Sequence, residues 1–345
     1  MMKYYHSTEF TSILNLSGTG YFPILGGKEH VINLNFTRKC RKALQNHDII
    51  GTVSAKGKDE RMIKLVAVDM DGTLLNTQGR VSDRNADAIR QLQERGIEVV
   101  VCTGRSYEDA AAPVREQGLR CDIICMNGSA VFDKDGRQIQ KSPLTYSQME
   151  EILSCCKDDK VIFDFMTNQG SYTIATEEEF KMCFESDILL PASVKHEYEQ
   201  IRPRFHLTTR EDLLSMGLEF YKVSVIHGNT FILEKIRGAL MGCHGLAAAS
   251  SYHTNIEITS RTAQKGIALT EYALGRGIGY REMMAIGDSE NDYSMLSLQL
   301  AYTVAMGNAM ESIKKIAKCQ TRSNVEDGVA YAIETLILSE EACAC

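Results

Sequence analysis

The residues with the clearest potential for chemistry are Asp69 and Asp71, which directly follow the apolar run 65–68. Such a run is typical of a central parallel strand, and in open α/β sheets ligands bind at the carboxyl ends of these strands. Because the two carboxylates are two residues apart, we expect a strand geometry to point both the same way. Two close anions are costly unless a cation or a shared proton compensates, and Mg²⁺, which prefers oxygen ligands, is the natural choice. An ordinary polar turn would also contain Asp and Gly, so further segments have to decide.

Further polar groups follow three later apolar segments. The groups that follow segments 97–102, 122–126 and 283–287 are, in chain order, Thr103, Gly104 and Arg105; Asn127; and Asp288, Asn291 and Asp292. Lys265 adds a cation at the start of a predicted helix, and we expect Glu290 to be merely solvated. Taken singly, Lys265 fits a solvated lysine and Asn127 fits a turn. Together, these groups supply the nucleophile, charge neutralisation and donors that phosphoryl transfer requires.

Strand and helix signals alternate around these groups. Ser82 and Ser106 are suitable N-caps for helices that Gly96 and Gly118 end. Strand, helix, strand and helix in this order predict a parallel sheet. The fold class that we predict is α/β, with a Rossmann-like parallel-sheet core domain and an inserted α+β cap domain.

The domain boundaries follow from changes in this rhythm. We predict a core domain from segments 62–142 and 254–340, with the strand-like run 255–258 marking the return to the core. The cap, 143–253, has longer polar loops and a capping-box pattern, Ser147 with Glu150, at its first helix.

Residues 1–61 show no sustained periodicity, and we expect weak or irregular structure there. The core strand starts just after Met62, and codons for residues 58–61 can resemble a bacterial ribosome-binding site. We therefore hypothesise, for a bacterial source, that the native protein begins at Met62. The competing interpretation is a docking arm.

Composition excludes several classes of protein. The 345 residues are 44% hydrophobic and 24% charged, which is typical of a soluble globular protein of two domains. A net charge of −7 argues against nucleic acid as a partner, and no apolar stretch approaches the roughly 20 residues that span a membrane. The 11 cysteines form no Cys-x-x-Cys pair, so we interpret them as reduced thiols in a cytoplasmic protein.

In the order and type of these groups, the chain resembles the haloacid dehalogenase superfamily, specifically the Cof-type phosphatases with a large (C2-type) cap. The resemblance covers about residues 62–340. It implies that Asp69 is the nucleophile that becomes an aspartyl-phosphate, and that Asp71 is the general acid and base. The phosphate- and substrate-binding residues that it implies are Thr103, Gly104, Arg105, Asn127, Lys265 and Asn291. The Mg²⁺ ligands that it implies are Asp69, the backbone carbonyl of Asp71, and Asp288, with Asp292 supporting the metal shell.

The function that we predict is a Mg²⁺-dependent phosphomonoesterase for small phosphorylated metabolites, sugar phosphates foremost. We expect a cytoplasmic monomer or homodimer without nucleic-acid or membrane partners. Two alternatives stay open on the sequence alone. A phosphosugar mutase would return the phosphoryl group to a sugar, and a non-catalytic phosphate-sensing regulator would have the fold without turnover.

Overall fold

The computed structural model describes residues 19–22, 30–33, 62–185 and 198–339. The chain divides into two units, Met1–Lys56 and Gly57–Cys345. In the first unit, strands β1 (Thr19–Phe22) and β2 (His30–Asn33) pair in antiparallel fashion, so the expectation of irregular structure is wrong for these two segments. The rest of 1–61 lies outside the described residues, and a native start at Met62 stays a prediction.

The second unit contains an eight-stranded sheet in the order β16-β15-β14-β3-β4-β5-β6-β7. Strands β16 to β5 in this order are parallel, and β6 and β7 add an antiparallel edge. Its strands are β3 (Leu65–Asp69), β4 (Glu98–Cys102), β5 (Asp122–Cys125), β6 (Ala130–Phe132), β7 (Gln138–Lys141), β14 (Met283–Gly287), β15 (Tyr302–Ala305) and β16 (Cys319–Gln320). The parallel sheet that the sequence predicts is thereby confirmed.

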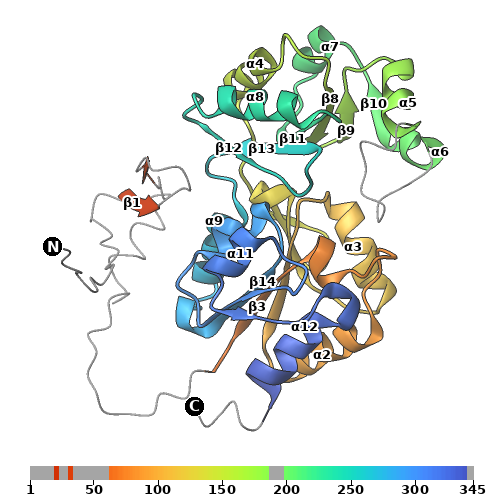
Figure 1. Cartoon of the computed structure of the whole chain (residues 1–345). Helices are drawn as coiled ribbons and strands as arrows, with labels where there is room; N and C mark the ends of the chain where they lie inside the picture. Colours follow the sequence, from red (N-terminus) through yellow and green to blue (C-terminus); the bar gives the residue numbers. More distant parts are fainter. Residues whose placement is uncertain (1–18, 23–29, 34–61, 186–197, 340–345) are drawn as a thin grey trace, which may run out of the picture. The chain divides into compact units, whose positions relative to one another are not determined.

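Helices cover this sheet, as Figure 1 shows. They are α2 (Asp83–Glu94), α3 (Tyr107–Glu116), α9 (Lys265–Gly275), α10 (Tyr293–Leu296), α11 (Glu311–Ile316) and α12 (Gly328–Ile333). Ser82 and Ser106 cap α2 and α3 as predicted, each accepting a hydrogen bond from a backbone N–H three residues on. Strand β3 is completely buried between these layers, which explains its uninterrupted apolar sequence.

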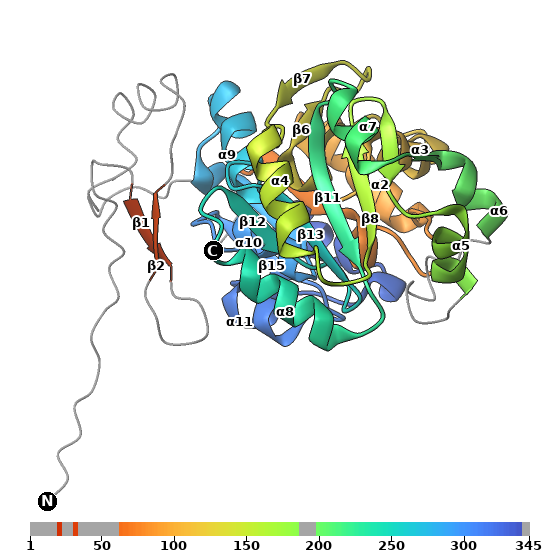
Figure 2. The ribbon, with the colours of Figure 1, turned by 90° about the horizontal axis from the view of Figure 1, so that it is seen from above.

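A second, six-stranded sheet has the order β10-β9-β8-β11-β13-β12. Its strands are β8 (Ile162–Thr167), β9 (Gly170–Thr173), β10 (Phe205–Leu207), β11 (Phe220–Ile226), β12 (Leu246–Ala249) and β13 (Asn255–Ser260), and its helices are α4 (Tyr146–Cys155), α5 (Glu177–Glu185), α6 (Tyr198–Ile201), α7 (Arg210–Ser215) and α8 (Thr230–Leu240). Seen from above in Figure 2, α4 and α8 lie over one face of this sheet. They bury Phe165, Val223 and Ile256, which point to that face.

Two sequence predictions are wrong in this region. Strand β13 pairs with β11 and β12 in the six-stranded sheet, so the return to the eight-stranded sheet does not begin at 254. Local periodicity predicts a strand but does not reveal its partners. The N-cap of α4 is Thr145, which forms a capping box with Gln148 in place of the predicted Ser147 and Glu150.

No helix in the described segments of the chain is both long and apolar enough to cross a membrane.

The six-stranded sheet has a hydrophobic core of its own, which a pair of phenylalanine variants can test. Phe165 is fully buried and stacks on Phe163, whereas Phe231 on α8 is 83% exposed. We expect Phe165→Ala to lower the free energy of unfolding by about 3–5 kcal/mol, because it leaves a cavity. The matched Phe231→Ala change should cost less than about 0.5 kcal/mol. Urea unfolding measures both, and equal losses would contradict this account of the packing.

Candidate active site

The carboxyl end of β3 places Asp69 in the interior, where it is 3% exposed. The strand stops at this residue, and the chain turns sharply through Gly72, whose φ of 75° favours glycine. A Cβ at Gly72 would lie 2.4 Å from Asp288 Oδ2, so the turn also brings the backbone close to the end of β14.

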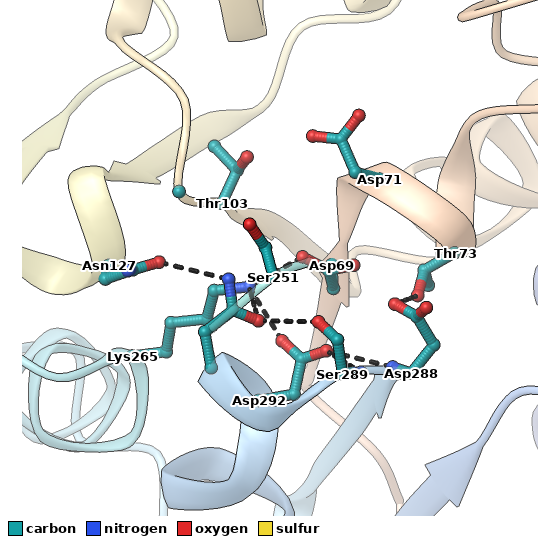
Figure 3. A network of polar contacts seen from close by, with 12 residues as sticks. Asp69, Asp71, Thr73, Thr103, Asn127, Ser251, Lys265, Asp288, Ser289 and Asp292 are labelled. Atoms are coloured by element: carbon teal, nitrogen blue, oxygen red, sulfur yellow. Dashed lines mark hydrogen bonds and ion pairs between the residues drawn. The ribbon is translucent and has the colours of Figure 1, made fainter. Parts of the chain in front are cut away.

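The side chains of Asp69 and Asp71 do not point the same way, contrary to the sequence expectation. Asp71 follows the strand and lies in the turn, so strand alternation does not apply to it. Its carboxylate points away from the cluster around Asp69 (Figure 3) and is 47% exposed. Arg105 holds it with two hydrogen bonds, Nη2 to Oδ1 at 2.6 Å and Nε to Oδ2 at 2.8 Å.

Lys265, the first residue of α9, is fully buried beside Asp69. Its Nζ donates to Asp69 Oδ1 at 2.6 Å, to Asp292 Oδ1 at 2.7 Å and to Asn291 Oδ1 at 3.4 Å. Burial lowers the pKa of Lys265, but Asp292 and Asp69 outweigh this effect and raise it above the ordinary value. Lys265 is therefore a fixed cation between two carboxylates.

Three carboxylates crowd around this single ammonium. One oxygen from each of Asp69, Asp288 and Asp292 lies within 4.8 Å of the others. Burial, followed by Asp292, raises the pKa of Asp69 to about 7, and burial and Asp69 raise that of Asp288. Asp69 Oδ2 is buried without a hydrogen-bond partner in the described structure. An all-oxygen set with excess negative charge and a free buried oxygen fits a hard divalent cation.

Asp292 organises the loop that follows β14. Its Oδ2 accepts the backbone N–H groups of Asp288 at 2.9 Å and Ser289 at 3.1 Å. A Cβ at Gly287 would lie 2.6 Å from this carboxylate, so only glycine leaves room for it. Thr73, from the turn after β3, donates to Asp288 Oδ1 at 3.2 Å.

The ends of β4 and β5 bring further predicted residues into place. Thr103 is buried, and its Oγ1 accepts the N–H of Arg105 at 3.1 Å. The N–H of Asn127 donates to the Thr103 carbonyl at 3.0 Å, which joins the two loops. Asn127 Oδ1 in turn accepts from Asn291 Nδ2 at 3.3 Å. A Cβ at Gly104 would lie 3.0 Å from Asn127 Oδ1, so this glycine leaves room for the amide.

The structure thus gathers the predicted residues at one edge of the sheet, and only the Asp71–Arg105 pair stands apart from the buried cluster. It also adds residues that sequence reasoning missed. Lys222 on β11 and Glu257 on β13 form a buried ion pair of 2.8 Å that reaches Gly104 and Asn127. Two features of the sequence could have identified them: a lysine inside the apolar run 220–226, and a glutamate between two isoleucines.

The expectation for Glu290 was wrong, and Ser251 was not predicted as a residue near the site. Glu290 was expected to be merely solvated, but it accepts hydrogen bonds from Arg237 at 3.2 Å and from the N–H of Ser250 at 2.9 Å. Ser251 donates from its Oγ to Glu257 Oε1 at 3.2 Å. The Glu290 contacts have no local sequence signal, because they join segments distant along the chain. Ser251 lies only six residues before Glu257, but no motif in the sequence marks their contact.

Comparison with known proteins decides the family. The family model for haloacid dehalogenase-like hydrolases matches residues 66–333. The chain belongs to this family. Phosphatase YwpJ of Bacillus subtilis is 33% identical over 80% of this chain and 100% of its own length. The 5-amino-6-(5-phospho-D-ribitylamino)uracil phosphatase YwtE of the same organism is 30% identical over 81% of this chain and 100% of its own.

A solved structure of a haloacid dehalogenase-like hydrolase from Bacillus subtilis also matches, with 32% identity and a TM-score of 0.72. It covers 80% of this chain and 100% of its own. These findings confirm the predicted family and the α/β fold class. The protein is a haloacid dehalogenase-type phosphatase.

The buried charge cluster predicts a strong dependence of stability on Lys265. We expect Lys265→Met to lower the free energy of unfolding by about 3–5 kcal/mol, because Asp69 and Asp292 lose their buried counter-ion. Lys314→Met is the matched control, since the partner of Lys314 within the described residues is the exposed Glu311 at 3.2 Å, and the change should cost less than about 0.5 kcal/mol. Chemical denaturation of both variants measures the difference, and similar losses would argue against the cluster.

Proposed function

We propose that the protein is a Mg²⁺-dependent phosphomonoesterase that acts on small phosphorylated metabolites through a phosphorylated Asp69. The observation that carries the proposal is the cluster at the carboxyl ends of β3 and β14. There, a buried carboxylate with one unpartnered oxygen lies 2.6 Å from a fixed ammonium and beside two further carboxylates. The relative YwtE acts, by its name, on a small phosphate monoester that contains a ribityl chain. We extend this substrate class, and sugar phosphates in particular, to the present chain.

The proposed metal ligands are Asp69, Asp288 and the backbone carbonyl of Asp71, with Asp292 supporting the metal shell. Bound Mg²⁺ would neutralise charge on the nucleophile and on the phosphoryl oxygens. The oxygen donor set and the excess of carboxylates over ammonium groups support this assignment.

The first chemical step is assigned to Asp69 and Asp71. A carboxylate oxygen of Asp69 attacks phosphorus, and the bond from phosphorus to the leaving oxygen breaks. Asp71, in its protonated form, gives its proton to that oxygen. Asp71 has to leave Arg105 to do this, because a carboxylate bound at both oxygens by a guanidinium has no proton to donate. We propose that the phosphate of the substrate competes for Arg105 and thereby releases Asp71.

The second step returns the enzyme to its starting state. Asp71 takes a proton from water, the resulting hydroxide attacks phosphorus, and the bond to Asp69 breaks with release of inorganic phosphate. Lys265 holds Asp69 in place throughout and balances the charge that collects on the phosphoryl oxygens. We assign the Thr103 hydroxyl and the amides of Asn127 and Asn291, together with Gly104 and Arg105, to phosphate and substrate binding.

We further propose that the six-stranded sheet and its helices are a cap over this site, spanning about 143–260. The contact from Lys222 to the Gly104 carbonyl at 2.6 Å supports a cap that reaches the phosphate-binding loops. Such a cap would exclude bulk water during phosphoryl transfer. A cytoplasmic location is part of the proposal, and the cysteines whose side chains the structure describes are free thiols. The oligomeric state, monomer or homodimer, stays a prediction.

Metal removal tests the proposed cofactor. Phosphate release from a panel of phosphorylated metabolites should vanish in excess chelator and return with added Mg²⁺. We expect Ca²⁺ to substitute poorly, because its longer bonds and higher coordination number would misplace the nucleophile. Full activity in chelator would contradict the metal assignment. A product that is an isomerised phosphosugar, without free phosphate, would favour the mutase.

Two Asp→Asn variants separate the proposed roles of Asp69 and Asp71. We expect Asp71→Asn to slow turnover about 10²- to 10⁴-fold, because it removes the acid and base. It should still be phosphorylated by an aryl phosphate, whose leaving group needs no protonation, and the phosphoenzyme should accumulate. Mass spectrometry of quenched protein should locate the phosphate on Asp69. Asp69→Asn should show neither phosphoenzyme nor turnover.

The control for both variants is Asp87→Asn on α2, where the carboxylate is exposed and, in the part of the chain that the structure describes, pairs with Arg90. It should keep wild-type activity. Substantial turnover in Asp69→Asn, or phosphate on a different residue, would show that Asp69 is not the nucleophile.

A further inference from the structure

Several charged side chains leave the six-stranded sheet on the face opposite its helices, and two of them form an ion pair. Lys222 on β11 is 2% exposed, and Glu257 on β13 is 5% exposed. Their strand neighbours Val223, Ile256 and Ile258 point the other way, into the hydrophobic core beneath α4 and α8. Strand alternation therefore directs both charges toward the eight-stranded sheet.

Glu257 bonds to residues from four different segments. Its Oε1 accepts from Lys222 Nζ at 2.8 Å and from Ser251 Oγ at 3.2 Å. Its Oε2 accepts from Asn127 Nδ2 at 2.8 Å and from Asn291 Nδ2 at 3.4 Å. One carboxylate of the cap thus holds the amides of two core loops.

The orientation of the Asn127 amide depends on this carboxylate. Its nitrogen faces Glu257, and its oxygen accepts from Asn291. A rotated amide would place its oxygen against the Glu257 carboxylate, and the two acceptors would repel each other. Glu257 therefore selects one of two amide orientations, and it does so beside the Thr103 and Gly104 loop, to which the Asn127 backbone is bonded.

Fold stability alone gives little reason for this arrangement. A buried ion pair can be replaced by well-packed apolar residues without loss of stability, since desolvation offsets the attraction between the charges. The pair is instead connected to the loops of the site. Lys222 Nζ also donates to the Gly104 carbonyl at 2.6 Å, and a Cβ at Gly104 would approach Glu257 Oε1 to 3.3 Å.

We propose that Glu257, paired with Lys222, is a positioning residue that fixes the Asn127 and Asn291 amides for the phosphoryl group. The cap thereby completes the phosphate-binding loops of the core in addition to covering them. This inference rests on the proposed phosphatase function and on the assignment of Asn127 and Asn291 to the phosphate.

Steady-state kinetics with p-nitrophenyl phosphate test the proposal, because this small substrate makes few demands on the cap surface. Glu257→Gln cannot accept hydrogen bonds at both ends of its side chain, so the amides should lose their fixed orientation. We expect kcat to fall about 10- to 100-fold, the usual effect of removing a group that orients a binding residue, with a change in KM of less than about threefold.

The matched control is Glu219→Gln. Glu219 lies next to β11 and pairs with Lys141 of β7 at 2.5 Å, so it also joins the cap region to the eight-stranded sheet. This pair, however, is exposed and bonds to none of the assigned site residues. Its kcat should stay within about twofold of wild type. A loss of kcat in Glu219→Gln equal to that in Glu257→Gln would overturn the proposal, because any contact between the cap region and the eight-stranded sheet would then have the same effect.

A double variant separates positioning from folding. Glu257→Gln leaves the Lys222 ammonium buried without its counter-ion and should lower Tm. Adding Lys222→Met removes that charge and should restore Tm toward wild type, while kcat stays low. If kcat recovered together with Tm, the pair would be purely structural and the proposal would be wrong.

Asn127→Ala completes the test. If Glu257 acts through Asn127, the double variant Asn127→Ala with Glu257→Gln should be no slower than the slower single variant. Multiplicative losses, or a Glu257→Gln enzyme with wild-type kcat, would overturn the positioning role while leaving the phosphatase function intact. A wild-type protein that hydrolyses no phosphoester would instead overturn the proposed function itself.

Discussion

The constraint on which this site depends is the crowding of three carboxylates, two of them buried, around one buried ammonium. Asp69 ends β3, Asp288 and Asp292 follow the adjacent parallel strand β14, and Lys265 comes from the start of a helix far from β3 in sequence. Asp69, Asp292 and Lys265 would each be costly to bury alone, so the fold keeps them as a mutually bonded group, while the half-buried Asp288 carboxylate accepts from Thr73. The negative charge that remains is what makes the cluster suited to a cation and to phosphoryl chemistry.

The surrounding backbone brings the residues of this cluster together and leaves room for their side chains. Parallel strands β3, β4, β5 and β14 end at one edge, so residues that are far apart in the chain converge there without long connecting loops. Glycine is needed where these loops approach one another. Gly72 and Gly287 leave room for the carboxylates of Asp288 and Asp292, and any larger residue would displace these carboxylates.

The six-stranded sheet contributes to the site by a different physical route. Helices α4 and α8 cover its hydrophobic face, which leaves the opposite face free to carry polar groups. Lys222 and Glu257 extend from that face, and their charges balance each other. Arg237 and the Ser250 backbone similarly bind Glu290 in the loop between Asp288 and Asp292. The loops that follow β4, β5 and β14 are therefore connected to the six-stranded sheet and its surroundings by buried or half-buried polar contacts.

The amino-acid sequence by itself determined the central strands, the helix caps at Ser82 and Ser106, and the polar residues that follow each strand. These features are local, since an apolar run, a cap or a turn is encoded by neighbouring residues. The convergence of Asp69 and Asp288 was also predictable, because the carboxyl ends of parallel strands share one edge of a sheet.

Only the tertiary structure decided the features that depend on distant partners. The sequence predicts β13 as a strand of the core domain, but its pairing with β11 and β12 places it in the six-stranded sheet. Asp71 reads as a second inward carboxylate until Arg105 is seen to bind it outside the cluster. Glu257 and Lys222 each look like an isolated charge in an apolar strand, and their role emerges from contacts with each other and with Asn127. The physical reason is that strand pairing and side-chain direction are set by long-range contacts, which local periodicity does not encode.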